Sequence, residues 1–287
     1  MPPRKPSPLG AHVLVAGGLV RAGLPYLEQV SAEAVQIFAG NPRGWALAAG
    51  DPAEDETFRA TCADRGWPVF VHAPYLVNIG SPTEATLVKS VASLRHSLAR
   101  GKRLGAAGVV VHAGSAVAAG ARDHALGQLR EHLLPLLDEM PADGPALLVE
   151  PTAGGPAALA AAIGDLEPYF AALEDHPRLG VCLDTCHLHA AGHDLASPGG
   201  VRTALTALVR AVGRGRLGLV HANDSRDPLG SGRDRHARIG AGSIGADSFA
   251  ELFRHPATRG VPVVIETPGS AEQQADDLRL LRALRDT

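Results

Sequence analysis

Cysteine is scarce in this chain of 287 residues, which contains only Cys62, Cys182 and Cys186. Such a small and odd number of cysteines excludes a disulfide framework, and the C-x3-C spacing of the last two does not match a zinc ribbon. We therefore expect all three to be buried thiols.

Long apolar runs are also absent. No segment approaches the roughly 18 consecutive apolar residues that a membrane span requires. The first residues, MPPRKPSP, lack the apolar core of a signal peptide. These absences predict a soluble, cytoplasmic protein with no membrane partner.

Basic charge is not in excess, because 27 lysines and arginines stand against 30 aspartates and glutamates, for a formal net charge of −3. Phosphate neutralisation drives nonspecific binding to nucleic acids, so any such binding must use a local patch. The candidate is the segment 225–238, in which Asp227 and Asp234 oppose four arginines. These are Arg226, Arg233, Arg235 and Arg238.

The chain does contain a regular alternation of short β-branched runs and amphipathic segments. This alternation predicts an α/β protein, a (β/α)8 TIM barrel forming a single domain over residues 9–287. The expected strands are 12–17, 34–40, 68–73, 108–114, 146–151, 179–185, 216–224 and 261–268. The proline-rich residues 1–8 are predicted to be a disordered N-terminal tail.

Six of the eight expected strands end in an imidazole or a carboxylate. These residues are His72, His112, Glu150, Asp184, His221 and Glu266. The carboxyl ends of barrel strands converge on one mouth, so these side chains should meet there. Carboxylates buried together cost several kcal/mol each unless cations neutralise them. Mixed histidine and carboxylate ligands suit zinc, with manganese or iron as alternatives.

Two further clusters enlarge the candidate ligand set. His187 follows Asp184 by three residues, and Asp234 and His236 form a D-x-H pair in the loop after the seventh expected strand. Nine candidate ligands are enough for more than one metal ion. His12, on the first expected strand, is predicted to support or pack against the site rather than to bind metal.

Nine strings occur in order along residues 10–268. They are GAHVLVAGGL, FAGNPRGW, HAPYLVNIG, HAGS, VEPTAG, VCLDTCHLHAAGHD, HANDS, DRHARIGAG and VIETP. Together they resemble the endonuclease IV family of abasic-site nucleases over nearly the whole chain, and LDTCH followed by HANDS and DRH is highly specific.

The resemblance implies three zinc ions, with Mn2+ as an alternative at one or more sites. The implied ligands are His72, His112 and Glu150 for the first ion, Asp184, His221, Glu266 and the bridging Glu150 for the second, and His187, Asp234 and His236 for the third. Glu150 and Glu266 are the expected catalytic residues. Arg43, Tyr75 and Leu76 match the family's side chains that enter the DNA helix at the lesion.

The implied function is base excision repair. The enzyme would hydrolyse the phosphodiester bond 5′ to an abasic site in double-stranded DNA, leaving a 3′-hydroxyl and a 5′ deoxyribose phosphate, with trimming of 3′ ends as a further activity. We expect a monomer that is associated with the nucleoid when it acts. Three positions depart from the family pattern without removing a ligand: Ala113, Pro151 and Ala241.

Two other interpretations remain open from the sequence. A sugar isomerase or epimerase of the xylose-isomerase-like barrel group also lines its mouth with histidines and carboxylates around a divalent metal. A barrel that uses zinc only for stability could bind damaged DNA without cutting it. The D-x-H loop and the third ligand group favour the hydrolase, and sites with three protein ligands leave room for water or substrate.

Overall fold

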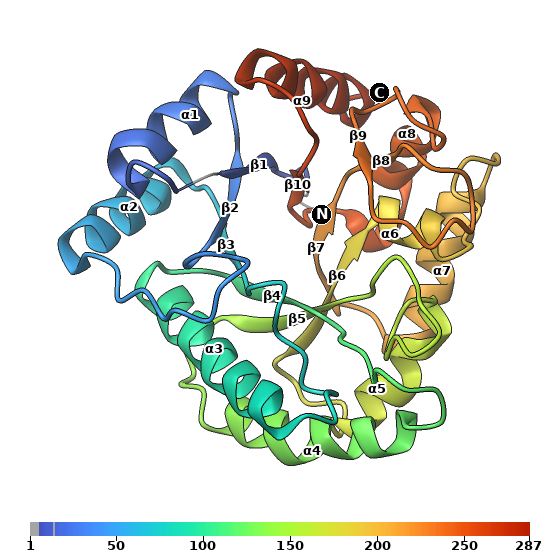
Figure 1. The fold of residues 1–287 in the computed structure, drawn as a ribbon. Helices are drawn as coiled ribbons and strands as arrows, with labels where there is room; N and C mark the ends of the chain where they lie inside the picture. The colour runs from blue at the N-terminus through green and yellow to red at the C-terminus, as the bar shows by residue number, and fades with distance from the viewer. Residues whose placement is uncertain (1–5, 14) are drawn as a thin grey trace.

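The computed structural model describes residues 6–13 and 15–287. Eight parallel strands close into a barrel in the order β1-β10-β7-β6-β5-β4-β3-β2, as Figure 1 shows. They are β1 Leu9–Val13, β2 Ala34–Phe38, β3 Val69–His72, β4 Gly108–His112, β5 Ala146–Glu150, β6 Leu179–Asp184, β7 Leu217–His221 and β10 Val263–Ile265. The predicted single (β/α)8 barrel domain is confirmed.

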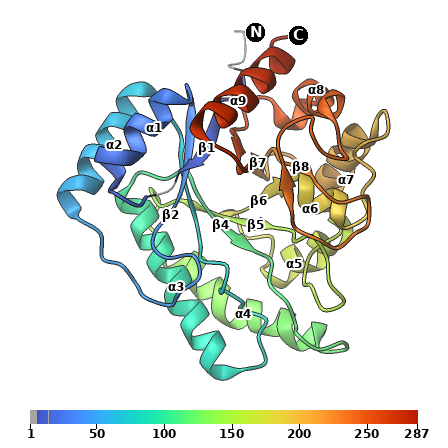
Figure 2. The same cartoon turned by 45° about the horizontal axis from the view of Figure 1, so that its top comes forward.

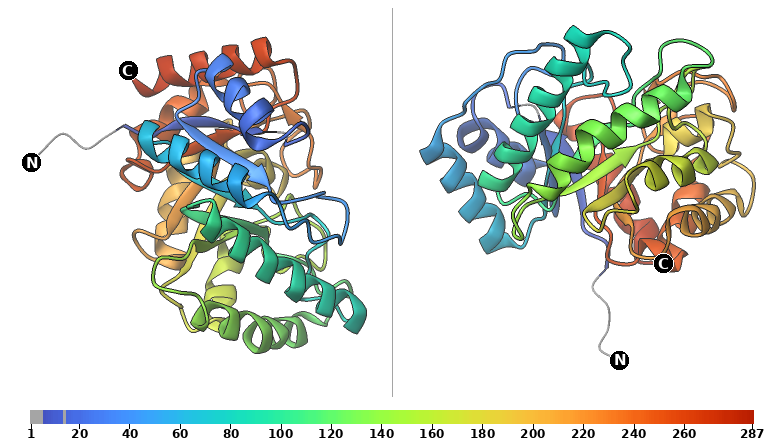
Figure 3. Two further views of the ribbon diagram at one scale, coloured as in Figure 1. Left: turned by 90° about the vertical axis from the view of Figure 1, so that its left-hand side faces the viewer. Right: turned by 90° about the horizontal axis from the view of Figure 1, so that it is seen from below.

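Helices form a ring around the barrel, seen from other directions in Figures 2 and 3. They are α1 Leu24–Gln29, α2 Pro52–Arg65, α3 Glu84–Arg103, α4 Arg122–Asp138, α5 Leu166–Ala172, α6 Thr185–Ala190, α7 Gly200–Val212, α8 Ala246–Arg254 and α9 Ala271–Arg285. A π-helical turn, Leu19–Gly23, and 3-10 turns at Ile163–Asp165 and Pro256–Thr258 complete the helical segments. No helix among the described residues is long and apolar enough to cross a bilayer.

Helix α7 illustrates how the sequence forms this ring. Its buried side chains recur at three- and four-residue steps, so one stripe faces the strands. They are Val201, Ala204, Leu205, Leu208 and Val212. The helix ends at Gly213, whose φ of 88° is costly for a residue with a side chain.

An apolar layer fills the interior of the barrel. It consists of Ala34, Phe70, Val110, Leu148, Cys182, Leu219 and Val264. The side chain of Leu148 fills the space left by glycines on nearby strands, because a Cβ added at Gly108, Gly180 or Gly218 would lie 2.7, 2.8 or 2.7 Å from it. The floor of the barrel is therefore packed, and only the layer above it can hold a ligand.

The start of the barrel differs from the prediction. Strand β1 begins at Leu9 rather than residue 12, and it pairs with β10 through Leu9 and Val263. A Cβ at Gly10 would lie 1.8 Å from Ala34 O, so the close approach of β1 to β2 requires a glycine at this position. Residue 14, within the predicted strand, lies outside the described residues.

Two residues of the predicted tail, Ser7 and Pro8, contact the barrel. Ser7 is 5% exposed, and its Oγ donates a hydrogen bond to Thr258 O at 2.7 Å. Pro8 O accepts a hydrogen bond from Val263 N at 2.8 Å. Tertiary contacts therefore extend to Ser7, whereas residues 1–5 of the predicted tail lie outside the described part of the chain.

The segment after β7 contains two short strands that the sequence did not predict. The expected strand 216–224 ends at His221, and β8 Asp224–Ser225 pairs antiparallel with β9 His236–Ala237. This pairing folds the loop that contains Asp234 back over the end of the barrel.

Candidate metal centre

The site forms from the side chains two residues beyond the apolar layer. Side chains on a strand alternate between its two faces, so the residue two positions along points to the same side. On each of seven strands, the residue two positions after the member of the apolar layer is polar and lies nearer the mouth. These residues are Gln36, His72, His112, Glu150, Asp184, His221 and Glu266.

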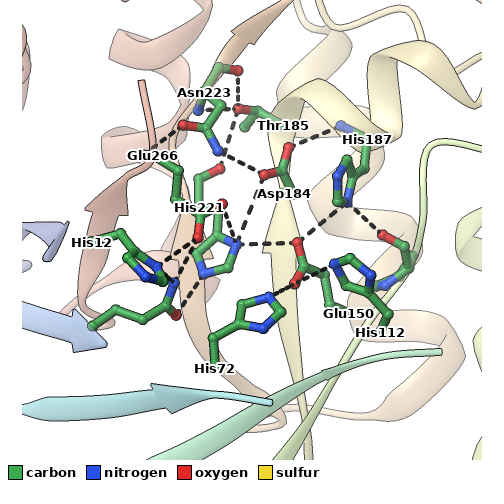
Figure 4. A network of polar contacts seen from close by, with 12 residues as sticks. His12, His72, His112, Glu150, Asp184, Thr185, His187, His221, Asn223 and Glu266 are labelled. Atoms are coloured by element: carbon green, nitrogen blue, oxygen red, sulfur yellow. Dashed lines mark hydrogen bonds and ion pairs between the residues drawn. The ribbon is translucent and has the colours of Figure 1, made fainter. Parts of the chain in front are cut away.

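Glu150 lies at the centre of this layer and is 1% exposed. Its Oε2 lies 3.2 Å from His72 Nε2 and 3.7 Å from His112 Nε2. Its Oε1 lies 3.1 Å from His221 Nδ1 and 3.2 Å from His187 Nδ1. Figure 4 shows the carboxylate between these rings. One carboxylate thus contacts four imidazoles and is placed to bridge two ligand groups.

His221 joins Glu150 to two further carboxylates. Its Nδ1 lies 3.5 Å from Glu266 Oε2 and 3.8 Å from Asp184 Oδ2. Asn223 holds both acids in place, because its Nδ2 donates to Asp184 Oδ2 at 2.7 Å and its Oδ1 accepts from Glu266 N at 2.8 Å (Figure 4). The second predicted ligand group is therefore assembled around His221 Nδ1.

The third predicted group lies at the more open side of the mouth. His187 Nε2 lies 3.2 Å from Asp234 Oδ2, and His236 Nε2 lies 3.0 Å from Asp234 Oδ1. Asp184 Oδ2 is 3.7 Å from His236 Nε2, so this group adjoins the second. Asp184 is the N-cap of helix α6, and its Oδ1 accepts from His187 N at 2.9 Å, so the start of the helix fixes His187 beside its neighbours.

Burial and neighbouring charges shift the pKa values of these groups. Burial lowers the pKa of His112 to about 4, so its ring is neutral at pH 7 and offers a lone pair. Burial alone would raise the pKa of Glu150, but the charge of His221 and hydrogen bonds from His187 and His221 hold it well below its usual value. At neutral pH the centre therefore presents ionised carboxylates together with the neutral imidazole of His112.

The predicted DNA-contact residues lie at the rim beside this centre. Tyr75 is 48% exposed, and its ring stacks on His112 with centroids 5.7 Å apart. Leu76 is half-buried and Arg43 is exposed on the neighbouring loop. Tyr75 N donates to Pro42 O at 3.0 Å, which ties the two loops together.

Comparison with known proteins places the chain in a family. The sequence model of the xylose isomerase-like TIM barrel family matches residues 24–284. A probable endonuclease 4 of Streptomyces avermitilis is 58% identical over 281 residues, covering 98% of this chain and 91% of the relative. The chain belongs to the endonuclease IV family. This membership confirms the predicted resemblance and the prediction that the chain is a nuclease.

Solved structures agree with the endonuclease IV assignment. The crystal structure of endonuclease IV from Thermus thermophilus aligns with a TM-score of 0.85 and 38% identity, covering 99% of both chains. A D-tagatose 3-epimerase-like protein aligns with a TM-score of 0.74 but only 17% identity, covering 97% of both chains. The second likeness shows a shared barrel fold alone.

The donor chemistry of the endonuclease IV centre fits metal ions. His72, His112 and Glu150 present ligand atoms that all lie within 4.8 Å of one another, and so do His187, Asp234 and His236. Imidazole and carboxylate donors in groups of three suit zinc in sites that keep an open position. All nine predicted ligand side chains therefore meet at one mouth, as the prediction requires.

Two buried amides in the centre were not predicted. Gln36 and Asn223 are both 0% exposed and hydrogen-bond to predicted ligands. Gln36 interrupts an otherwise apolar strand, AVQIF, and Asn223 follows His221 by two residues in HANDS. A buried polar residue in an apolar strand was the available signal.

The three departures from the family pattern leave the backbone contacts of the site intact. Pro151 O accepts from His187 Nδ1 at 3.0 Å, a bond that needs only a carbonyl. Ala113 N donates to Glu150 O at 2.9 Å. Ala241 is exposed in the turn after Ile239. None of these positions contributes a side chain to the candidate ligand groups.

Proposed function

We propose that this protein is an abasic-site endonuclease of DNA repair. It hydrolyses the phosphodiester bond 5′ to an abasic nucleotide in duplex DNA and leaves a 3′-hydroxyl and a 5′ deoxyribose phosphate. The observation that carries this proposal is the convergence of nine imidazole and carboxylate side chains in three adjoining groups beside the exposed ring of Tyr75.

Three zinc ions held by these side chains, with Mn2+ as an alternative at one or more sites, would supply Lewis acidity toward the phosphoryl group and activate water as the nucleophile. Glu150 and Glu266 are the proposed catalytic residues, and each has a carboxylate oxygen near His221 Nδ1 at the centre of the layer. Three of the nine, His187, Asp234 and His236, face the more open side, where a phosphate can approach.

Residues at the rim account for binding the lesion. A nucleotide without a base has less stacking to lose when it leaves the helix, so an abasic backbone enters the mouth more readily than an intact one. Tyr75 offers an aromatic face to a neighbouring base, while Leu76 and Arg43 flank it on the same pair of loops.

The arginine-rich segment supports phosphate contacts on the opposite side of the mouth. Arg235 is held by an ion pair with Asp227, and Arg238 by one with Asp277. Arg226 and Arg233 are exposed on this segment. A local cationic patch of this kind suits a protein whose formal net charge is −3.

Incision of a defined duplex tests the proposal. The substrate carries one tetrahydrofuran abasic mimic, and the control duplex is identical but has an intact base. We expect zinc-loaded protein to cut only the first, on the 5′ side of the mimic, and the product to be extendable by a polymerase because it ends in a 3′-hydroxyl. Absence of incision with zinc or manganese, together with turnover of a ketose, would establish the epimerase alternative instead.

A further inference from the structure

Gln36 occupies a place in the barrel that its neighbours give to candidate metal ligands. It lies on β2, two residues beyond Ala34 of the apolar layer, and is 0% exposed. A buried side-chain amide is stable only when its polar atoms are hydrogen-bonded. The partners of Gln36 therefore indicate what it does.

Both ends of the Gln36 amide contact candidate ligands. Its Nε2 donates to Glu266 Oε1 at 2.7 Å, and its Oε1 lies 2.8 Å from His221 Nε2. An ionised carboxylate can only accept hydrogen bonds, so the NH2 group must face Glu266 and the amide oxygen must face His221. The amide oxygen can only accept, so His221 Nε2 carries a proton.

The protonated Nε2 determines which nitrogen of His221 is available to a cation. Once a cation replaces the proton on Nδ1, only that nitrogen can offer a lone pair, and it points toward carboxylate oxygens of Glu150 at 3.1 Å, Glu266 at 3.5 Å and Asp184 at 3.8 Å. The opposite tautomer would direct an N–H at these acids and leave the amide oxygen of Gln36 facing a lone pair.

Three other histidines of the site have a backbone carbonyl as the acceptor instead. His72 Nδ1 lies 2.7 Å from Ala73 O, His187 Nδ1 lies 3.0 Å from Pro151 O, and His236 Nδ1 lies 3.3 Å from Glu266 O. In these three rings a backbone carbonyl accepts from Nδ1, which leaves Nε2 of His72 and His236 for the centre, whereas His187 Nδ1 also lies 3.2 Å from Glu150 Oε1. His221 instead has the side chain of Gln36 in that role, so its orientation can be tested by substitution.

We propose that Gln36 is a positioning residue that holds His221 in its Nε2–H tautomer and fixes the carboxylate of Glu266, so that both address the same metal ion. The inference rests on the proposed function for the presence of that ion. A hydrogen bond to the far nitrogen of a metal-bound histidine orients its ring, and loss of such a partner typically weakens metal affinity by about 10- to 100-fold.

His12 is a second contact of the same amide and belongs in the design of the test. Its Nδ1 lies 2.9 Å from Gln36 Nε2 and 3.1 Å from Glu266 Oε1. If Gln36 is removed, His12 still reaches Glu266, whereas His221 Nε2 loses the amide oxygen that accepts from it. The effect should therefore appear at His221 more strongly than at Glu266.

Two substitutions separate positioning from simple filling of the barrel. Gln36→Leu keeps a side chain of similar bulk but removes the acceptor and the donor. Gln36→Glu keeps an acceptor for His221 and loses the donor to Glu266. Val35→Ala, on the outward face of the same strand, is the control for a packing defect.

The first readout is the tautomer of His221 by 15N NMR of histidine-labelled, zinc-loaded protein, with the signal assigned by its loss in His221→Ala. We expect a slowly exchanging Nε2–H in the native protein and in Gln36→Glu, and rapid exchange of that proton in Gln36→Leu. The second readout is zinc affinity, measured by chelator competition. We expect the affinity for one of the zinc ions to fall by about 10- to 100-fold in Gln36→Leu and to stay unchanged in Val35→Ala.

Unchanged proton exchange and unchanged zinc affinity in Gln36→Leu would overturn the inference. If Gln36→Leu does not fold, Gln36→Glu is the test instead. Loss of the Nε2–H signal of His221 in Gln36→Glu would then overturn the inference. Failure of the proposed function is distinct from either result, because the native protein would then bind no zinc or leave the abasic duplex uncut.

Discussion

At the scale of single residues, Glu150 should be the most sensitive position of the centre. Its carboxylate contacts His72, His112, His187 and His221, so replacement by an amide removes the charge that all four imidazoles share. We expect Glu150→Gln to lower abasic-site incision by more than about 100-fold, since loss of a mere partner of a metal ligand already costs up to that much. Single-turnover incision and elemental analysis measure the two effects.

The matched control for Glu150→Gln is the same change at Glu139, a half-exposed residue that pairs with Arg95 on the outer helices. Surface ion pairs contribute little to stability, so Glu139→Gln should behave like the native protein. Native incision rates and native zinc content in Glu150→Gln would show that the bridging carboxylate is not required.

Tyr75 tests the lesion-binding surface separately from the metal centre. Stacking of a base on an aromatic ring is worth about 1–3 kcal/mol, so Tyr75→Ala should weaken binding to abasic duplex by roughly 5- to 150-fold. The zinc content should not change, because the ring only stacks on His112 and does not hydrogen-bond to it. Tyr75→Phe should retain most of the affinity. Equal affinity of Tyr75→Ala and native protein in fluorescence anisotropy would refute the role of the ring.

Residue types explain which parts of the site the sequence could predict. Histidines and carboxylates at the ends of apolar strands are recognisable because burial of such groups demands a partner. Gln36 stands out as an amide in an apolar strand, but because it carries no charge its type did not indicate which group it contacts. Its role follows only from the register that places it beside His221.

At the scale of elements, the loop after β7 depends on one buried carboxylate. Asp224, on β8, is 0% exposed and accepts hydrogen bonds from five backbone N–H groups. They belong to Ser225, Gly240, Gly242, Ile244 and Gly245. This cage fixes the turn that follows β9, which carries His236.

Gly242 is the position where this cage can be broken by a single methyl group. A Cβ there would lie 2.3 Å from Ser225 O and 2.4 Å from Asp224 Oδ1, so the turn must move. We expect Gly242→Ala to destabilise the protein by about 1–3 kcal/mol in urea unfolding. It should also speed amide exchange across residues 240–245 and reduce zinc occupancy of the group that contains His236.

A glycine-to-alanine change at a position without close neighbours is the control for the destabilisation expected of Gly242→Ala. Gly127 lies exposed within α4, and a Cβ there meets nothing within 4 Å. Gly127→Ala should stabilise the helix by about 0.5–1 kcal/mol. If Gly242→Ala were as stable as Gly127→Ala, the Asp224 cage would not be the element that holds the turn.

Element boundaries were predictable only where side-chain patterns mark them. The seven strands after the first were found because apolar runs end at polar residues and turns. Strand β1 was displaced because Gly10 and Ala11 have low strand propensity, and close packing against Ala34 rather than propensity selects them. The two-residue strands β8 and β9 have no periodic pattern to detect, since their pairing depends on the Asp224 cage.

At the scale of the whole molecule, stability and function depend on two different layers of side chains along the same strands. The apolar layer around Leu148 closes the barrel, and the polar layer two residues later forms the centre. A substitution in the first layer should therefore affect folding, and one in the second should affect metal binding. The predicted convergence of the ligands follows from the predicted barrel, because the parallel strands of a barrel bring their carboxyl ends to one mouth.

Removal of metal should make the stability of the whole protein depend on pH. Burial opposes protonation of His187, His221 and His236, but the neighbouring acids raise their pKa values above 6.5, to about 9 for His236. A proton on such a ring stabilises the folded state fully below about pH 6.5, and this contribution is lost as the pH rises toward 9. The carboxylates Glu150 and Glu266 have lowered pKa values, so their contribution is lost only in acid.

Metal-stripped protein should therefore be most stable between about pH 5 and pH 6.5, and by about pH 9 it should lose on the order of 3 kcal/mol through His236 alone. Zinc-loaded protein should not show this loss, because metal ligands are already deprotonated and the cation replaces the protons. Thermal unfolding with and without chelator at about pH 6 and about pH 9 measures the difference. His236→Asn should flatten the curve of the stripped protein, and a stripped native protein equally stable at both pH values would show that these imidazoles do not share the charge of the acids.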